Sequence, residues 1–223
     1  MMQRITKKEL LPLIKQYLPD DPIIVEAGCF DGGDTLQLSA FWPQATIHAF
    51  EPVPEIFSML THNTHHNPAI MRHNCALAAH TGTAQLHLSS RPTAPDEPFR
   101  AGSLLAPKER LTWSNVTYPK TITVDTITLD RWAEQQQLDH IDFLWLDVQG
   151  FALPILQAAP QILKTLRVLY VEVEFIEAYE GQHQYHAVRT WLESQGFTMI
   201  ARDFDDTPHW FFGNAILVNN AFL

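Results

Sequence analysis

The chain has 223 residues, of which 46% are hydrophobic and 18% are charged, and this length is enough for one large domain. Fifteen Lys and Arg residues against 25 Asp and Glu residues give a formal net charge of -10, which argues against a protein that binds nucleic acid or an anionic membrane. Two cysteines cannot build a disulfide framework, and no apolar run approaches the ~20 residues of a membrane span, so we expect a cytoplasmic protein.

The first part of the chain predicts alternating strands and helices. Residues 1–21 predict an N-terminal helical extension that packs on the main domain, residues 22–223. The alternatives are that this extension covers the site or mediates a homodimer. Apolar runs at 23–25, 46–50 and 70–77 are typical of strands, and apolar residues at helical spacing follow the first two. This βαβαβ order predicts a parallel sheet with right-handed crossovers.

The rest of the chain continues the pattern after an interruption. Four prolines between Arg91 and Pro107 predict a surface loop over one sheet edge. Further strands are expected at 121–124, 141–146 and 168–173, and helices at 129–136, 153–159 and 183–195. Strands at 197–202 and 210–218 are joined by a loop that permits only an antiparallel pair. The sequence therefore predicts an α/β fold with a mostly parallel, seven-stranded sheet, an antiparallel C-terminal hairpin and helices on both faces, as in class I methyltransferases.

A strand that ends in an acid leads into a glycine-rich turn. Gly28 and Gly32 lack a Cβ atom and would let the backbone approach a ligand at the carboxyl end of the first strand. The spacing matches neither the dinucleotide-binding glycine pattern nor a phosphate loop. Glu26 would repel a pyrophosphate, but its carboxylate suits an ammonium or sulfonium group.

The second predicted strand also ends in an acid. Glu51, followed by Pro52, would accept both hydroxyls of a ribose. The third strand ends in small residues around Asn74 and Ala76, which predicts a slot for an adenine ring with a hydrogen bond from Asn74. Two strand-end acids around a glycine turn predict a nucleoside that carries positive charge, which S-adenosylmethionine fits better than NAD.

Further acids follow the later strands at the same sheet edge. Asp147 ends the strand at 141–146 and would hold the methionine part of the cofactor, orient an acceptor hydroxyl or accept its proton. Glu172 and Glu174 share one face of the next strand. As general base we rank Asp147 first, then Glu174, then His183. A divalent metal ion between the two leading candidates is an open alternative without support from the sequence.

From about Ile23 to Phe197 the chain resembles the FkbM family of S-adenosylmethionine-dependent methyltransferases. The resemblance is carried by several motifs in a specific order: Glu-Ala-Gly at 26–28, Ala-Phe-Glu-Pro at 49–52, Gly-Ser-Leu-Leu at 102–105, Val-Asp-Thr-Ile-Thr-Leu-Asp at 124–130, Ile-Asp-Phe to Asp-Val-Gln-Gly at 141–150, and Val-Glu-Val-Glu at 171–174. It implies a Rossmann-like fold and O-methylation of a hydroxyl on a sugar, a glycan or a natural product. Through the same resemblance, Ser103 and Trp145 are expected on the substrate side of the crevice.

Three residues depart from the family pattern. Trp145, Gln149 and Ala152 stand where the family usually has Lys, Glu and Glu, so acceptor chemistry is affected more than cofactor binding. Two alternatives therefore stay open. One is an NAD-dependent α/β oxidoreductase, whose glycine fingerprint is missing here, and the other is a non-catalytic module that binds an adenosyl ligand.

Overall fold

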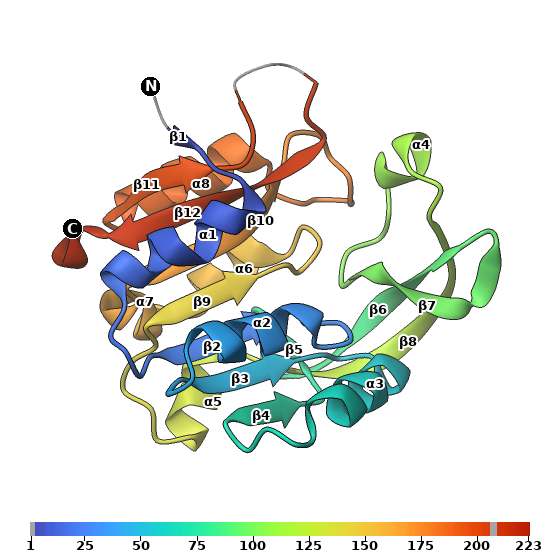
Figure 1. Ribbon diagram of the computed structural model, residues 1–223. Coiled ribbons are helices and arrows are strands. Elements are labelled where there is room, and N and C mark those ends of the chain that lie inside the picture. The colour runs from blue at the N-terminus through green and yellow to red at the C-terminus, as the bar shows by residue number, and fades with distance from the viewer. Residues whose placement is uncertain (1–2, 206–208) are drawn as a thin grey trace.

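The computed structural model describes residues 3–205 and 209–223, which form a layered α/β structure around one large sheet (Figure 1). The strand order is β1 (Gln3–Arg4), β11 (Phe197–Arg202), β12 (Phe212–Asn219), β10 (Val168–Glu174), β9 (Phe143–Leu146), β2 (Ile23–Ala27), β3 (Thr46–Phe50) and β4 (Ile70–His73). The strands from β10 to β4 run parallel, whereas β12 is antiparallel to both of its neighbours. The predicted fold class is confirmed, with β1 as an additional edge strand.

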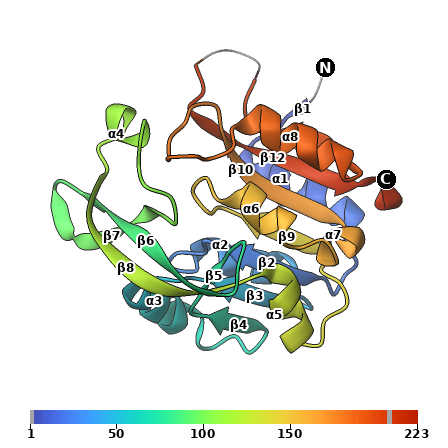
Figure 2. The ribbon, with the colours of Figure 1, turned by 180° about the vertical axis from the view of Figure 1, so that it is seen from behind.

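Helices cover both faces of this sheet (Figures 1 and 2). One face carries α1 (Lys7–Ile14), α2 (Gly33–Phe41) and α3 (Pro54–Thr64), and the other carries α5 (Leu129–Gln135), α6 (Ala152–Gln157), α7 (Ile162–Thr165) and α8 (Tyr185–Ser194). The central strands are mostly apolar because each of their faces meets a helical layer.

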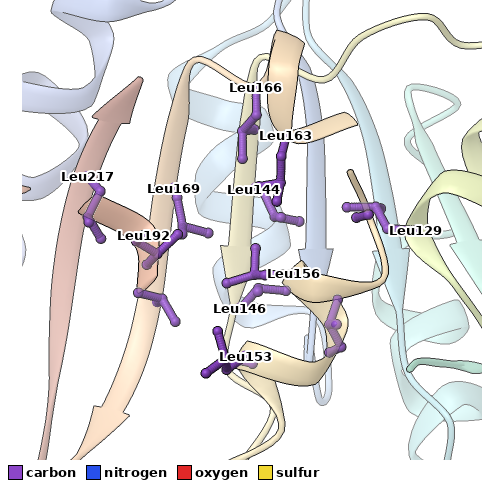
Figure 3. Close-up of a cluster of buried hydrophobic side chains, with 14 of the residues drawn as sticks. Leu129, Leu144, Leu146, Leu153, Leu156, Leu163, Leu166, Leu169, Leu192 and Leu217 are labelled. Carbon is purple, nitrogen blue, oxygen red and sulfur yellow. The ribbon is translucent and has the colours of Figure 1, made fainter. Parts of the chain in front are cut away.

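The strand β9 shows how this two-sided burial works. Phe143 and Trp145 pack in the layer beneath α1 and α2, whereas Leu144 and Leu146 point to the opposite layer. There they meet the buried leucines of α5, α6 and α7 (Figure 3). Each fully buried leucine stabilises the fold by about 1.5–3 kcal/mol relative to an exposed one. This core holds the carboxyl end of β9 in a fixed position.

A second, four-stranded sheet stands beside the carboxyl ends of the main one. Its order is β5 (Ala76–Leu77), β8 (Thr117–Ile127), β6 (Gly82–Arg91) and β7 (Ala94–Ser103), and the short helix α4 (Arg110–Trp113) follows β7 (Figure 1). The surface loop predicted between Arg91 and Pro107 is therefore wrong. Pro95 and Pro98 lie in β7, and an edge strand tolerates proline because one of its sides needs no ladder hydrogen bonds.

The single third strand predicted over 70–77 is also wrong. The chain leaves the main sheet after His73, and Ala76 and Leu77 pair instead with Thr126 and Ile127 of β8. The polar Asn74 lies at this break. The end of β4 is thus where the chain passes from one sheet to the other.

The N-terminal segment packs on the main sheet. Its strand β1 pairs parallel with β11, and Ile5, Leu10 and Ile14 are buried in the layer beneath α1. The backbone N–H of Thr6 donates to the Glu9 carboxylate at 2.8 Å, which caps the start of α1. The expected helix is present, with a strand before it, and the boundary of the main domain at residue 22 stays a prediction.

Candidate active site

The ends of β2 and β9 meet where the strand order reverses. From β2 the chain proceeds outward to β3 and β4, and it later returns to place β9 on the other side of β2. Open α/β sheets bind ligands at such a switch point. Gly28 has a φ of +87°, and a Cβ atom built on it would lie 1.8 Å from the carbonyl oxygen of Asp147. Glycine is therefore required for the turn after β2 to touch the end of β9.

A first cleft of about 680 Å³ opens beside this contact. Its walls come from the strand ends of the main sheet and from the second sheet, and they include Ala27, Gly28, Phe30, Glu51, Pro52, Val53, Ala76, Leu77, Arg100, Leu104, Asp147 and Gln149. The lining is mostly apolar with a few polar groups, as is typical of small-molecule sites. Of the predicted cofactor residues, Gly28, Glu51, Pro52, Ala76 and Asp147 are brought together here.

Glu51 is the buried acid of the first cleft. Its side chain is only 5% exposed, and its Oε1 accepts a hydrogen bond from the backbone N–H of Val53 at 2.9 Å. Burial raises the pKa of Glu51 to about 7, although backbone N–H groups of Val53 and Phe30 favour the charged form. A ligand that offered hydroxyl donors would stabilise the charged carboxylate.

Glu26 lies behind the glycine turn and lines neither this cleft nor the second one described below. Its carboxylate accepts a hydrogen bond from the Thr35 hydroxyl at 2.5 Å, which ties the end of β2 to α2. Burial raises the pKa of Glu26 to about 8. Its predicted contact with a cofactor stays a prediction.

Two other predicted cofactor residues also hold the turns around the cleft. Gly32 is the N-cap residue of α2 and has a φ of +86°. A Cβ atom at Gly32 would lie 2.8 Å from Leu60 Cδ1 and 3.0 Å from Thr64 Cγ2 of α3. The amide of Asn74 donates to the carbonyl oxygens of Glu51 at 2.9 Å and Pro52 at 3.3 Å. Neither residue lines the first cleft, so their roles in binding stay predictions.

Gln149 links the two acids at the ends of β9 and β10. Its Nε2 donates to Asp147 Oδ1 at 2.7 Å and to Glu172 Oε1 at 2.9 Å, and its Oε1 accepts from the hydroxyl of Tyr179 at 2.9 Å. Burial raises the pKa values of both Asp147 and Glu172. The hydroxyl of Ser103 donates to the Gln149 carbonyl at 2.7 Å and so supports the backbone of Gln149, whose φ is +48°. Our sequence analysis did not assign Gln149 a site role, although its position two residues after a strand-end acid is a usable signal.

The other candidate bases differ sharply in their surroundings. Glu174 is 3% exposed, and its Oε1 has no hydrogen-bond partner within the described ranges. Burial, together with the charge of Asp147, raises the pKa of Glu174 to about 8. His183 is exposed in the loop before α8 and lines neither cleft.

A second cleft of about 790 Å³ lies on the side of the sheet covered by α1. It is lined by Ile5, Thr6, Lys7, Leu10, Asp34, Trp145, Asp147, Tyr170, Glu172, Asp203, Phe212 and Asn214. Trp145, predicted on the substrate side, therefore faces this cleft, whereas Ser103 lines neither cleft. No local motif links these segments, so sequence reasoning missed most of the lining.

Among residues 3–205 and 209–223, no three or more His, Cys, Asp or Glu side chains gather so that they could hold a metal ion. In the same part of the chain, no helix has both the length and the apolar character needed to cross a membrane.

The family model of the methyltransferase FkbM domain matches residues 33–199. The chain belongs to the FkbM methyltransferase family. It is 30% identical to the 2-O-methyltransferase NoeI of Sinorhizobium fredii over 183 residues. The aligned region covers 82% of this chain and 74% of that relative. It is 28% identical over 205 residues to the methyltransferase sdnD of Sordaria araneosa, with 83% and 77% of the two chains covered.

Solved structures agree on the fold. A methyltransferase FkbM from Methylobacillus flagellatus KT superimposes with a TM-score of 0.56 at 14% identity over 88% of this chain, which spans only 44% of that larger chain. An rRNA methylase from Streptococcus thermophilus gives a TM-score of 0.54 at 11% identity, with 98% and 99% of the two chains covered. The resemblance inferred from the motifs is confirmed, and with it the Rossmann-like fold and the class of S-adenosylmethionine-dependent methyltransferases. The family match gives no support to the NAD-dependent alternative.

Proposed function

We propose that this FkbM methyltransferase transfers the methyl group of S-adenosylmethionine to a hydroxyl oxygen of a sugar, a glycan or a natural product. The observation that carries the proposal is the first cleft, in which a buried acid and an apolar slot open onto Asp147. The name of NoeI as a 2-O-methyltransferase supports an oxygen acceptor.

The residues of the first cleft fit the methyl donor. Glu51 would bind the ribose hydroxyls, and Val53, Ala76 and Leu77 would enclose the adenine ring. The turn at Gly28 would direct the rest of the molecule towards Asp147, because the two residues are in contact. S-adenosylmethionine supplies a methyl group that its sulfonium sulfur already activates.

The protein's contribution to the reaction is then to position the acceptor and to take its proton. An alcohol is a weak nucleophile at neutral pH, so a base beside its oxygen accelerates the reaction. We assign this role to Asp147, which receives the hydroxyl proton as the new carbon–oxygen bond forms. The raised pKa of Asp147 makes it a stronger base than an ordinary aspartate, and the hydrogen bond from Gln149 fixes its orientation.

The experiment compares three variants, one for each candidate base. Asp147→Asn keeps an acceptor for the Gln149 hydrogen bond, so its affinity for S-adenosylmethionine should stay within about threefold while turnover falls by about 10²–10⁴-fold. Glu174→Gln and His183→Ala should lose much less. Calorimetry measures the binding, and mass spectrometry of the methylated product over a panel of sugars and alcohols measures the turnover.

Each failure of that experiment has a distinct meaning. Absence of S-adenosylmethionine binding to the wild-type protein contradicts the proposed function. Binding without turnover on any acceptor favours the non-catalytic adenosyl-binding module. A larger loss in Glu174→Gln than in Asp147→Asn moves the base to Glu174.

From composition we also propose a cytoplasmic location and the absence of a nucleic-acid partner. A homodimer formed through the N-terminal segment is proposed as an alternative to its packing on the main domain.

A further inference from the structure

We propose that the second cleft binds the methyl acceptor, and that this acceptor is a neutral, hydroxyl-rich ring such as an uncharged sugar rather than a sugar acid or a phosphate. The inference rests on the proposed function, because it needs a methyl donor in the first cleft. It adds to that function the position at which the acceptor binds and the prediction that the acceptor is uncharged.

The position of the second cleft is the first argument. Among the described residues, Asp147 alone lines both clefts. Reactants bound in the two clefts would both lie next to Asp147, and direct transfer needs such proximity. The remaining lining of the two clefts is separate, so each cleft can select its own ligand.

The aromatic walls of the second cleft are the second argument. The rings of Trp145 and Tyr170 lie 4.2 Å apart between their centroids, and Phe212 lines the cleft from β12. Aromatic rings give a rigid apolar surface, and a sugar ring presents an apolar face of C–H groups to such a surface. Polar groups around these rings would then bind the hydroxyls at the edge of the sugar.

The charged groups of the second cleft supply the selectivity. Four of the lining residues are acids, namely Asp34, Asp147, Glu172 and Asp203. Carboxyl oxygens accept hydrogen bonds from hydroxyl groups and disfavour an anion nearby. Among the described residues, Lys7 is the one cation of the lining, and its Nζ already lies 3.1 Å from Asp34 Oδ1. Arg110 does not line the cleft but is close enough to favour the charged forms of Asp147 and Glu172, and its guanidinium packs over the rings of Trp113 and Phe212. The four acids of the lining outnumber these cations, which disfavours an anionic acceptor.

The N-terminal segment forms one wall of the second cleft. Thr6, Lys7 and Leu10 lie in the lining, although they precede the main domain in the sequence. This places the segment over the substrate side and gives it a role in acceptor binding.

The test uses two sugars that differ at one carbon. Methyl α-glucoside carries a neutral hydroxymethyl group where methyl α-glucuronide carries a carboxylate. Saturation-transfer NMR on the protein loaded with S-adenosylhomocysteine should show the glucoside binding at least tenfold more tightly than the glucuronide. Phe212→Ala should weaken glucoside binding at least fivefold and leave the affinity for S-adenosylhomocysteine within twofold.

Phe211→Ala is the matched control for that substitution. Phe211 is exposed at the neighbouring position and lines neither cleft, so its truncation should leave glucoside binding unchanged. Equal binding of the two sugars, or equal effects of the two substitutions, overturns the inference. So does a loss of S-adenosylhomocysteine affinity in Phe212→Ala that matches the loss for the glucoside, because the second cleft would then hold the donor.

The remaining outcomes separate the inference from the function on which it rests. If S-adenosylhomocysteine binds but the neutral sugar does not, the acceptor class is wrong and the proposed function stands. If S-adenosylhomocysteine itself does not bind, the proposed function fails with it.

Discussion

The two clefts on either side of Asp147 are built in different ways. In the first cleft, the wall on the main-sheet side is made of residues at or just after strand ends, such as Gly28 and Glu51, and the other wall is made of side chains of the second sheet, such as Leu86 and Phe99. The second cleft is formed by side chains from α1, β9, β10 and the final hairpin, which are far apart in the sequence. The strand ends of the fold therefore specify one wall of the first cleft, whereas individual side chains determine the second cleft.

The largest expected effect tests the backbone contact that supports the first cleft. In Gly28→Ala the new Cβ atom would lie 1.8 Å from the Asp147 carbonyl oxygen at a φ of +87°. We expect a loss of about 4 kcal/mol in the free energy of unfolding, because left-handed strain and a backbone clash add up. Urea unfolding of the purified variant measures it.

Gly196→Ala is the control for the strain alone. Gly196 has the same φ of +87°, but nothing lies within 4 Å of its Cβ position. Its substitution should cost about 1 kcal/mol. Equal losses in the two variants would show that the contact between β2 and β9 contributes nothing beyond the turn conformation.

The next effect concerns the acids shared by the second cleft. Gln149 is 6% exposed and donates to both Asp147 and Glu172, so Gln149→Glu would replace these donors by a third buried carboxyl group. We expect a loss of about 3 kcal/mol in the free energy of unfolding at pH 8. The buried carboxyl groups become protonated in acid, so the loss should shrink towards pH 5.

Gln16→Glu is the control for the added charge, because Gln16 is exposed on the N-terminal segment. It should change the stability by less than about 0.5 kcal/mol at either pH. A stable Gln149→Glu at pH 8 would mean that the hydrogen bonds from Gln149 do not hold the two acids.

The difference between the clefts also explains what could be predicted from the sequence. The strands of the main sheet and the first-cleft residues Gly28 and Glu51 follow from apolar runs that end in acids or glycines. Such signals are local, since the residues that form a strand end are neighbours in the chain. The family resemblance rests in part on the same segments, at 26–28, 49–52, 141–150 and 171–174.

The features that sequence analysis missed depend on contacts between distant segments. The strand β7 contains two prolines and reads as a loop, because nothing local shows that it lies at a sheet edge. Asn74 looked like an adenine contact, but its amide instead holds the carbonyl oxygens of Glu51 and Pro52. The meeting of Lys7 with Asp34 in the second cleft has no sequence signal at all.

The third effect on stability concerns Glu51, where folding and binding have opposite requirements. Its pKa is raised from an ordinary 4.5 to about 7 in the folded protein, so the folded state binds the proton more tightly than the unfolded state. The contribution of Glu51 to stability is therefore complete below pH 4.5 and is lost as the pH rises through about 7. Glu51→Gln removes this loss, and we expect the variant to gain about 3 kcal/mol over the wild type at pH 9 and little at pH 4.

The same substitution should weaken the binding of S-adenosylhomocysteine by about 10–100-fold at pH 8, because the neutral amide replaces a charged acceptor for the ribose hydroxyls. Thermal unfolding across the pH range and calorimetry at pH 8 measure the two effects on one protein. Glu55→Gln, on the exposed first turn of α3, should change neither by more than about 0.5 kcal/mol. If Glu51→Gln gains stability and keeps its affinity for S-adenosylhomocysteine, the Glu51 carboxylate destabilises the fold without binding the ribose. The ribose must then bind elsewhere in the first cleft.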